Sequence, residues 1–208
     1  MSKTTIPTGG ITADAINGAL IADDAINSEH YTDASIDTAH VADSQITLAK
    51  TSGVGGLSEG DQWRVTADFS SDDTDPIASN WERVDTNSDK VGTGMSQSSG
   101  VFSFPSTGIY FIEYRSNYMI NGQTGYSSVN IRMTTNNSSF VTIAGSNSAV
   151  ANLSTDSYLS LATSAIVDIT NVSTHKVRFA VSGQASVLWR GASDRNETYA
   201  TFLKLGAT

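Results

Sequence analysis

Large apolar residues recur at every fifth position of this chain between residues 11 and 46, and this interval constrains its fold more than any other feature. Residues 11–50 divide into four lines of ten, ITADAINGAL, IADDAINSEH, YTDASIDTAH and VADSQITLAK. The apolar positions are Ile11, Ile16, Ile21, Ile26, Tyr31, Ile36, Val41 and Ile46. An unbroken series of this kind indicates an internal repeat.

Neither regular secondary structure keeps a five-residue interval on one face. Five residues advance about 500° round an α-helix, which spreads the apolar side chains over its whole surface. In a continuous strand, an odd step places successive side chains on opposite faces. The interval therefore predicts a chain that bends once per repeat and returns an apolar residue to the same axis.

Three chains that share one axis bury these residues with the fewest repeats, so we predict a homotrimeric stalk with the eight apolar residues as its core. A single-chain β-solenoid would have only about two coils, when repeat folds need roughly three or more units. A disordered or partly helical tether is the remaining alternative.

His30 and His40 hold equivalent positions in their lines. We interpret them as solvated or axis-stacked polar residues rather than as a metal site.

Aromatic residues separate the chain into parts. All three Trp, all seven Phe and six of the seven Tyr lie beyond residue 60, so the material for a packed core is C-terminal. We predict an N-terminal anchor arm over residues 1–10, a stalk over 11–50, a Gly/Ser linker over 51–61 and a head domain over 62–208.

Short runs with β-type composition follow one another through the predicted head, separated by turn-forming segments such as PSTG and TNNSS. The runs cover residues 63–69, 101–104, 109–119, 127–135, 140–144, 158–169, 176–181, 186–189 and 198–205. About nine short strands at hairpin spacing are typical of an antiparallel sandwich or jelly roll. The fold class is therefore all-β, with a head of about nine to ten strands.

The segment GVFSFPSTGIYFIEY (100–114) resembles the central motif of the globular-head superfamily shared by complement component C-one-q and tumour necrosis factor. The match falls on Gly100, Phe102, Phe104, Pro105, Gly108 and Tyr110. TYATFLKLG (198–206) is similar to the last strand of that family. The resemblance implies a ten-strand jelly roll over residues 62–208 that assembles as a tight trimer.

Residues 109–119 are apolar on both faces of the predicted strand, with Tyr110, Phe111, Ile112, Tyr114, Tyr118 and Met119 in one run. Such a strand is buried on one side by its own core and on the other by a neighbour, although a central strand of a monomeric sandwich is the alternative. The predicted head core and trimer interface comprises Phe102, Phe104, Tyr110, Ile112, Tyr114 and Phe202.

The composition argues against several classes of function. The net charge is −9, and the sequence has no basic stripe that could neutralise phosphates. We therefore expect no nucleic-acid partner. The chain has no Cys, no apolar stretch long enough for a membrane span and no apolar signal-peptide core. We therefore expect no membrane insertion and a route to the exterior such as cell lysis.

No catalytic motif is present, and we expect neither enzymatic activity nor a cofactor or metal. The head has a single His, His175, which we expect at the surface and which has no recognisable nucleophile motif beside it. Asp72, Asp73 and Asp75 form an acidic stretch before Pro76. We interpret it as a solvated turn, with a calcium loop as the alternative.

The ten-residue lines resemble repeats in tail-fibre and other virion proteins of marine phages. This resemblance implies a virion structural protein on the external surface, a trimeric fibre that contacts capsid, neck or tail through its N-terminus. We expect the head to bind a host-surface glycan or protein, with Tyr126, Trp189 and Arg190 as contacts at loop tips. The alternatives are a capsid cement protein that acts through its N-terminal arm, and a secreted lectin.

Overall fold

The structure is a computed structural model of the 208-residue chain, which divides into two compact units, Met1–Ser52 and Gly53–Thr208. The residues it describes are 9–12, 20, 21, 31, 36, 41, 56–70, 73–121, 125–150, 156–183 and 187–208.

In the N-terminal unit, the described residues bend at the first apolar position of each ten-residue line. The bends fall at Ile11, Ile21, Tyr31 and Val41, whereas Ile36, in the middle of its line, has none. Ile11, Tyr31 and Ile36 expose about half of their surface. A single chain thus leaves these residues in water, and their burial on a shared axis stays a prediction. Five of the repeat residues named above lie outside the described part of the chain, namely Ile16, Ile26, Ile46, His30 and His40.

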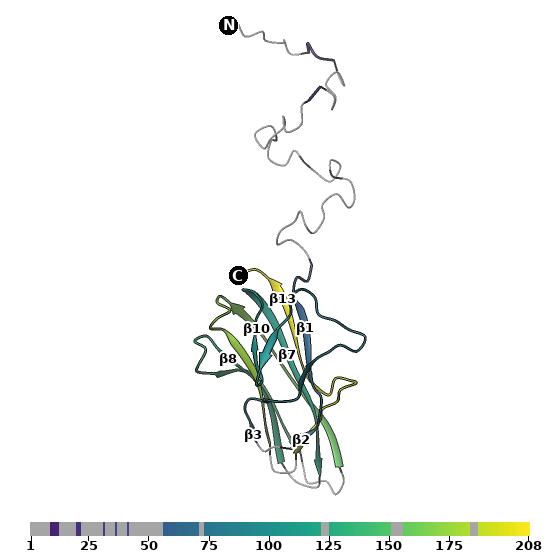
Figure 1. Ribbon diagram of the computed structural model, residues 1–208, viewed down its shortest axis with the longest axis vertical. Helices are drawn as coiled ribbons and strands as arrows, with labels where there is room; N and C mark the ends of the chain where they lie inside the picture. The colour runs from purple at the N-terminus through teal and green to yellow at the C-terminus, as the bar shows by residue number, and fades with distance from the viewer. Residues whose placement is uncertain are drawn as a thin grey trace. The chain divides into compact units, whose positions relative to one another are not determined.

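The described residues of the C-terminal unit fold as thirteen strands without a helix (Figure 1). The strands are β1 Gly60–Val65, β2 Phe69–Ser70, β3 Asp73–Thr74, β4 Trp81–Arg83, β5 Ser96–Ser98, β6 Val101–Ser103, β7 Gly108–Asn121, β8 Gly125–Thr134, β9 Val141–Val150, β10 Asp156–Ile169, β11 Lys176–Gly183, β12 Val187–Trp189 and β13 Thr198–Gly206. All nine predicted runs contain a strand, and the all-β antiparallel fold is confirmed. The sequence does not predict β3, β4 or β5, which have only two or three residues each.

Strand β7 is the centre of the first sheet. It pairs with β10 along its whole length, from Gly108 opposite Ile169 to Asn121 opposite Asp156. Along its other edge it pairs first with β13 and then with β12. Strands β1 and β4 continue this sheet beyond β13, and β2 lies beside β12. We call this sheet A.

The second sheet, sheet B, has the order β5–β6–β11–β8–β9, with β3 also paired to β11. All pairs in both sheets are antiparallel. The inward side chains of the two sheets meet in one core, which makes the head a two-layer antiparallel jelly roll.

Aromatic rings fill the space between the sheets. Phe102 of β6 packs edge-to-face on Trp81 with ring centroids 5.1 Å apart, and Phe179 of β11 lies 4.8 Å from Tyr114 of β7. Pairs of this geometry stabilise by about 0.5–1.5 kcal/mol beyond the burial of their area. All six residues predicted for the head core are buried, namely Phe102, Phe104, Tyr110, Ile112, Tyr114 and Phe202.

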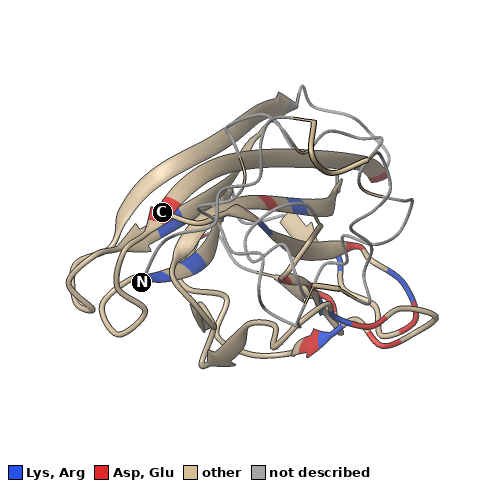
Figure 2. Cartoon of the chain, turned by 90° about the horizontal axis from the view of Figure 1, so that it is seen from above, with Lys and Arg blue, Asp and Glu red and all other residues tan. Residues whose placement is uncertain are grey.

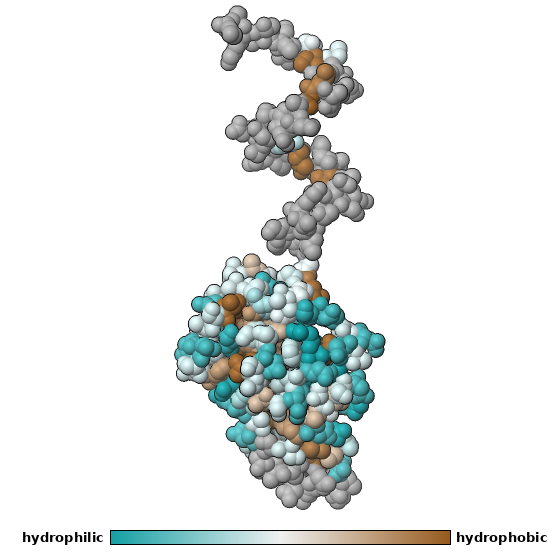
Figure 3. All heavy atoms as spheres, in the orientation of Figure 1, coloured by the Kyte–Doolittle hydropathy of each residue, from teal (hydrophilic) through white to brown (hydrophobic). Residues whose placement is uncertain are grey.

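The surface of the head is mixed. Acidic and basic residues lie close to one another in Figure 2 and form no stripe of one sign in that view. Apolar patches interrupt the polar surface in Figure 3. The faces that these views show thus carry charges of both signs and separate apolar patches.

Gly100 is required by the turn that precedes β6. Its φ of +77° lies in the left-handed region, and a Cβ at this position would meet the carbonyl oxygen of Ile77 at 2.0 Å. Any other residue would be both strained and in collision with backbone. The first glycine of the motif at residues 100–114 is therefore fixed by packing against the segment before β4.

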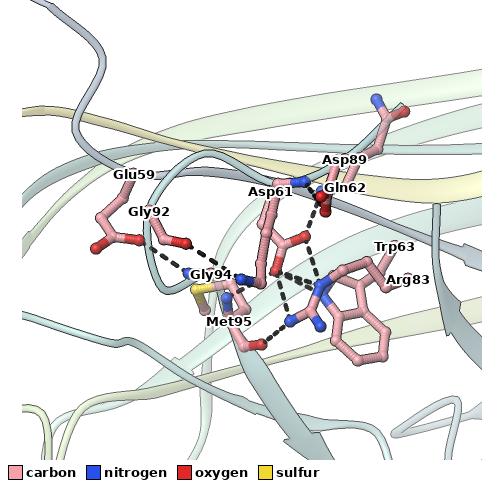
Figure 4. A network of polar contacts seen from close by, with 10 residues as sticks. Glu59, Asp61, Gln62, Trp63, Arg83, Asp89, Gly92, Gly94 and Met95 are labelled. Carbon is pink, nitrogen blue, oxygen red and sulfur yellow. Dashed lines mark hydrogen bonds and ion pairs between the residues drawn. The ribbon is translucent and has the colours of Figure 1, made fainter. Parts of the chain in front are cut away.

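The buried carboxylate of Asp61 connects β1 to the segment between β4 and β5 (Figure 4). Its Oδ2 accepts hydrogen bonds from the Trp63 indole at 2.9 Å and from the Met95 backbone N–H at 2.7 Å. Arg83 Nε donates to Oδ1 at 3.0 Å. Residues 60 and 61 thus belong to the head rather than to the predicted linker, because β1 begins at Gly60 and Asp61 is buried.

Replacing Asp61 by Ala should lower the free energy of unfolding by about 3 kcal/mol, because Arg83 and two N–H groups lose their acceptor. Urea denaturation at one protein concentration measures the loss. Asp194→Ala is the matched control, since the exposed pair of Asp194 with Arg195 contributes at most about 1 kcal/mol. Equal, small losses in both variants would contradict the role given to Asp61.

Candidate interaction face and groove

The outer face of sheet A carries the features that point to interaction. Strand β10 alternates along its length, and every even-numbered residue from Asp156 to Asp168 is exposed. On β7, the odd-numbered residues face outward beside them, because directly opposed residues of an antiparallel pair share a face. Of the predicted two-faced run, Tyr110, Ile112, Tyr114 and Tyr118 are buried inside the sandwich, and Phe111 and Met119 face out.

Three apolar side chains form a row across this face. Leu203 of β13 lies opposite Phe111 of β7, which in turn lies opposite Ile166 of β10. Leu203 and Phe111 are half-buried, and Ile166 exposes 67% of its surface. Covering such a side chain stabilises by about 1.5–3 kcal/mol. This apolar row is therefore a favourable place for another molecule to pack.

A second row lies toward the other end of β7, where Leu188, Met119 and Tyr158 are opposed. Tyr158 exposes 70% of its surface, the most of any described aromatic residue. Polar residues separate the two rows, among them Arg115, whose Nε donates to Ser160 Oγ at 2.9 Å. The outer face of sheet A thus has an apolar end and an end where an aromatic ring adjoins polar groups.

An open groove of about 340 Å³ lies at this second end. Strands β7 and β10 and the segment before β13 form it. Its lining residues are Asn117, Tyr118, Tyr158, Leu159, Ser160, Arg190 and Glu197.

Hydrogen bonds fix the acidic wall of the groove. Glu197 Oε2 accepts from Asn117 Nδ2 at 2.7 Å, and Oε1 accepts from Arg195 Nε at 2.8 Å. These two contacts hold the pKa of Glu197 below its usual value, the Asn117 hydrogen bond having the larger effect. The carboxylate is therefore ionised at neutral pH and acts as an acceptor.

Arg190 forms the basic wall of the groove, and an ion pair and a backbone hydrogen bond hold it in place. Arg190 Nη1 pairs with Asp68 Oδ2 at 3.0 Å, and the Arg190 backbone N–H donates to the Asn117 carbonyl at 2.9 Å. Asp68 is itself anchored, since its Oδ1 accepts from the Gly191 N–H at 2.8 Å. These contacts anchor the polar groups of the groove to the residues around it.

The structure separates the three residues predicted to contact a receptor. Arg190 lines the groove, whereas Tyr126 is half-exposed on β8 of sheet B and has no part in it. The prediction for Trp189 is wrong, because this residue is fully buried and packs on Tyr118 at a centroid distance of 5.1 Å. Strand alternation explains the error: Trp189 follows the outward Leu188 and points inward.

Within the acidic stretch before Pro76, the prediction of a solvated turn is wrong for Asp75. Asp75 lies between Arg132 of β8 and Arg178 of β11, which are opposed across sheet B, and its Oδ2 accepts from Arg178 at 2.8 Å. Two guanidinium groups thus compensate this carboxylate. Asp73 is exposed in β3, and Asp72 lies outside the described residues. Within the described part of the chain, no cluster of His, Asp or Glu is arranged as a metal site.

His175 is buried instead of lying at the surface. Its Nδ1 is 3.1 Å from Thr174 Oγ1 and its Nε2 is 3.4 Å from Thr170 Oγ1. These contacts satisfy the ring locally at the turn that precedes β11, which is a structural role.

Sequence reasoning missed the groove residues other than Arg190. Asn117 and Glu197 are 80 positions apart, and Tyr158 belongs to a third segment. The one available signal was the alternation in DSYLSLATSAIVDI, which places Tyr158 and Ile166 on the same face as small polar residues. Strand alternation identifies such positions, at which one large residue stands on a strand face that is otherwise small and polar.

Solved structures of tumour-necrosis-factor type are among those with a similar arrangement. Eiger TNF from S. frugiperda has a TM-score of 0.55 at 13% identity, over 72% of this chain and 93% of that chain. Murine APRIL has a TM-score of 0.50 at 15% identity, over 71% of this chain and 98% of that chain. No protein-family profile and no curated protein sequence matches the chain. The head therefore has a tumour-necrosis-factor-like jelly-roll fold.

The part of the chain that the structure describes contains no helix with the length and hydropathy of a membrane span.

The lowered pKa of Glu197 predicts a pH-dependent contribution to stability. Because the folded-state pKa lies below the unfolded value of about 4.5, the contribution is complete above that value and is lost as the pH falls through the folded-state pKa. Denaturation of the native protein and of Glu197→Gln should therefore differ by up to about 1 kcal/mol at neutral pH and converge in acid. A difference that stays constant over the whole range would contradict this account.

Proposed function

We propose that this chain is a non-enzymatic binding protein of a virus particle, a homotrimeric bacteriophage fibre whose head contacts the host surface. The observation that carries the proposal is the unpartnered apolar row Leu203–Phe111–Ile166 on the outer face of sheet A. A second and a third copy of the chain are its proposed occupants.

Two further features support a threefold assembly. The jelly roll is of the tumour-necrosis-factor type, which the motif at residues 100–114 led us to associate with trimers. Independently, the stalk repeats leave apolar residues such as Ile11 and Tyr31 half-exposed in a single chain. Both parts of the molecule thus present apolar surface that a common threefold axis would cover.

The mode of action that we propose is binding. Three heads on one stalk engage a repeated ligand together, so that weak individual contacts add up to firm attachment. In this proposal residues 1–10 contact capsid, neck or tail proteins, the stalk spaces the head from the particle, and the molecule lies on the external surface. The resemblance of the stalk repeats to phage virion proteins supports this placement.

Truncation separates a fibre from a cement protein. Particles assembled with a chain that lacks residues 60–208 should remain intact and lose attachment to host cells. If instead particles fall apart on removal of residues 1–50 while loss of the head changes nothing, the chain is a capsid cement protein and the fibre proposal fails.

The proposed assembly predicts the effect of a charge on the apolar row. Ile166→Glu places an unpaired carboxylate in the head interface, so the trimer should dissociate at higher protein concentrations than the native trimer does, which light scattering over a dilution series measures. The head itself should stay folded, because Ile166 contributes little to the core of a single chain. Val141→Glu is the matched control: Val141 is similarly exposed, at 61%, on β9 of the other sheet, and this variant should remain trimeric.

A further inference from the structure

Two charged residues of strand β7 stand on the outer face of sheet A without an ion-pair partner in the described part of the chain. We propose that Arg115 of one copy of the chain pairs with Glu113 of the next copy, and that this contact repeats around the ring of heads. The inference rests on the proposed homotrimer and names the polar contacts that align its copies.

Glu113 and Arg115 lie between the two rows of apolar residues on this face. Phe111 belongs to the apolar row and Met119 to the second row. The outward residues of β7 between them are Glu113, Arg115 and Asn117, and the neighbouring strands β10 and β13 carry no charge in the same stretch. A strand rises about 3.4 Å per residue, so Glu113 lies only about 7 Å from Phe111. A molecule that packs on the apolar row therefore also covers Glu113.

Neither charge is compensated within one chain. Among the described residues, the Glu113 carboxylate has no hydrogen-bond or ion-pair partner, and the residues opposite it are the uncharged Thr201 and Ser164. Arg115 uses one of its five N–H groups, in the bond from Nε to Ser160 Oγ. In a single copy Arg115 is exposed and Glu113 is half-buried. Both side chains thus have free capacity to bind an opposite charge.

Other charged groups around this face are paired or lie outside the rows. Carboxylates of the same chain hold Arg64, Arg190 and Arg195. Asp156 and Asp168 stand at the two ends of β10, outside the two rows. The two charges between the rows are therefore the ones that assembly buries without a partner from their own chain.

A neighbouring copy offers the missing partner for each charge. Burial of an unpaired charge is costly, whereas two opposite charges that are buried together compensate one another. A threefold contact is heterologous, so a residue of one copy meets a different residue of the next copy. One acid and one base on the same face let every copy pair with both of its neighbours. Alignments that bring like residues together are disfavoured, because like charges repel.

The test uses full-length chains in which one charge is reversed, Glu113→Arg or Arg115→Glu. Each variant alone brings like charges together, so its trimer should dissociate at protein concentrations about tenfold or more above those of the native trimer. Light scattering over a dilution series measures this shift. The double variant Glu113→Arg/Arg115→Glu exchanges the two charges and should behave as the native chain does. Circular dichroism verifies folding, which should be unchanged because both side chains point away from the core.

Mixing the two single variants distinguishes a pair between copies from a pair within one chain. Glu113→Arg and Arg115→Glu chains are produced in the same cells with tags of different mass, and native mass spectrometry determines the composition of the trimers. A pair between copies favours mixed trimers over random assembly, because opposite charges then meet across most contacts. The controls are Val141→Arg/Thr142→Arg and Val141→Glu/Thr142→Glu, which change the net charge equally at exposed positions of β9 and should assemble nearly at random.

Two outcomes would overturn the inference alone. One is that the single variants form trimers as stable as those of the β9 controls. The other is that mixed trimers form no more often than in the controls, since the two charges would then be paired within one chain. A native chain that is monomeric at every concentration would overturn the proposed homotrimer as well.

Discussion

The structure depends on strand β7, which has apolar residues on both of its faces and is paired along both of its edges. Its inward residues Tyr110, Ile112, Tyr114 and Tyr118 have almost no exposed surface and make up much of the core between the sheets. Its outward residues include Phe111, which no part of the described head covers completely. A strand of this kind is stable when something packs on each side. Packing on the outer side, where Phe111 lies, links the fold of one chain to its proposed assembly.

Much of the fold follows from local pattern, and most of the site does not. All nine runs that alternation and turn composition predict contain a strand, because side-chain direction along a strand is a property of consecutive residues. Trp189 was placed on the surface because its neighbours Arg190 and Gly191 look like a loop, whereas its strand turns it inward. Asp75 was interpreted as solvated because its partners Arg132 and Arg178 are far away in the sequence. The groove was missed for the same reason.

The outer face of sheet A suggests how the proposed fibre assembles. The apolar row near the start of β7 is the part suited to other copies of the chain, since apolar contact needs little directional chemistry. A single weak contact between one head and the host surface would not hold a particle to a cell, and three heads on one stalk would raise the effective affinity without any new contact. The stalk repeats and the head are in this sense parts of one mechanism.

The central claim is that other copies of the chain cover the outer face of sheet A, and hydroxyl-radical footprinting of the native protein tests it most directly. The method compares the modification of Ile166 with that of Val141, two aliphatic side chains with similar exposure in a single chain, at 67% and 61%. The account predicts that Ile166, with Phe111 and Leu203 beside it, is protected while Val141 is modified freely. Equal modification of Ile166 and Val141 would show that the face is open to water and would contradict the account.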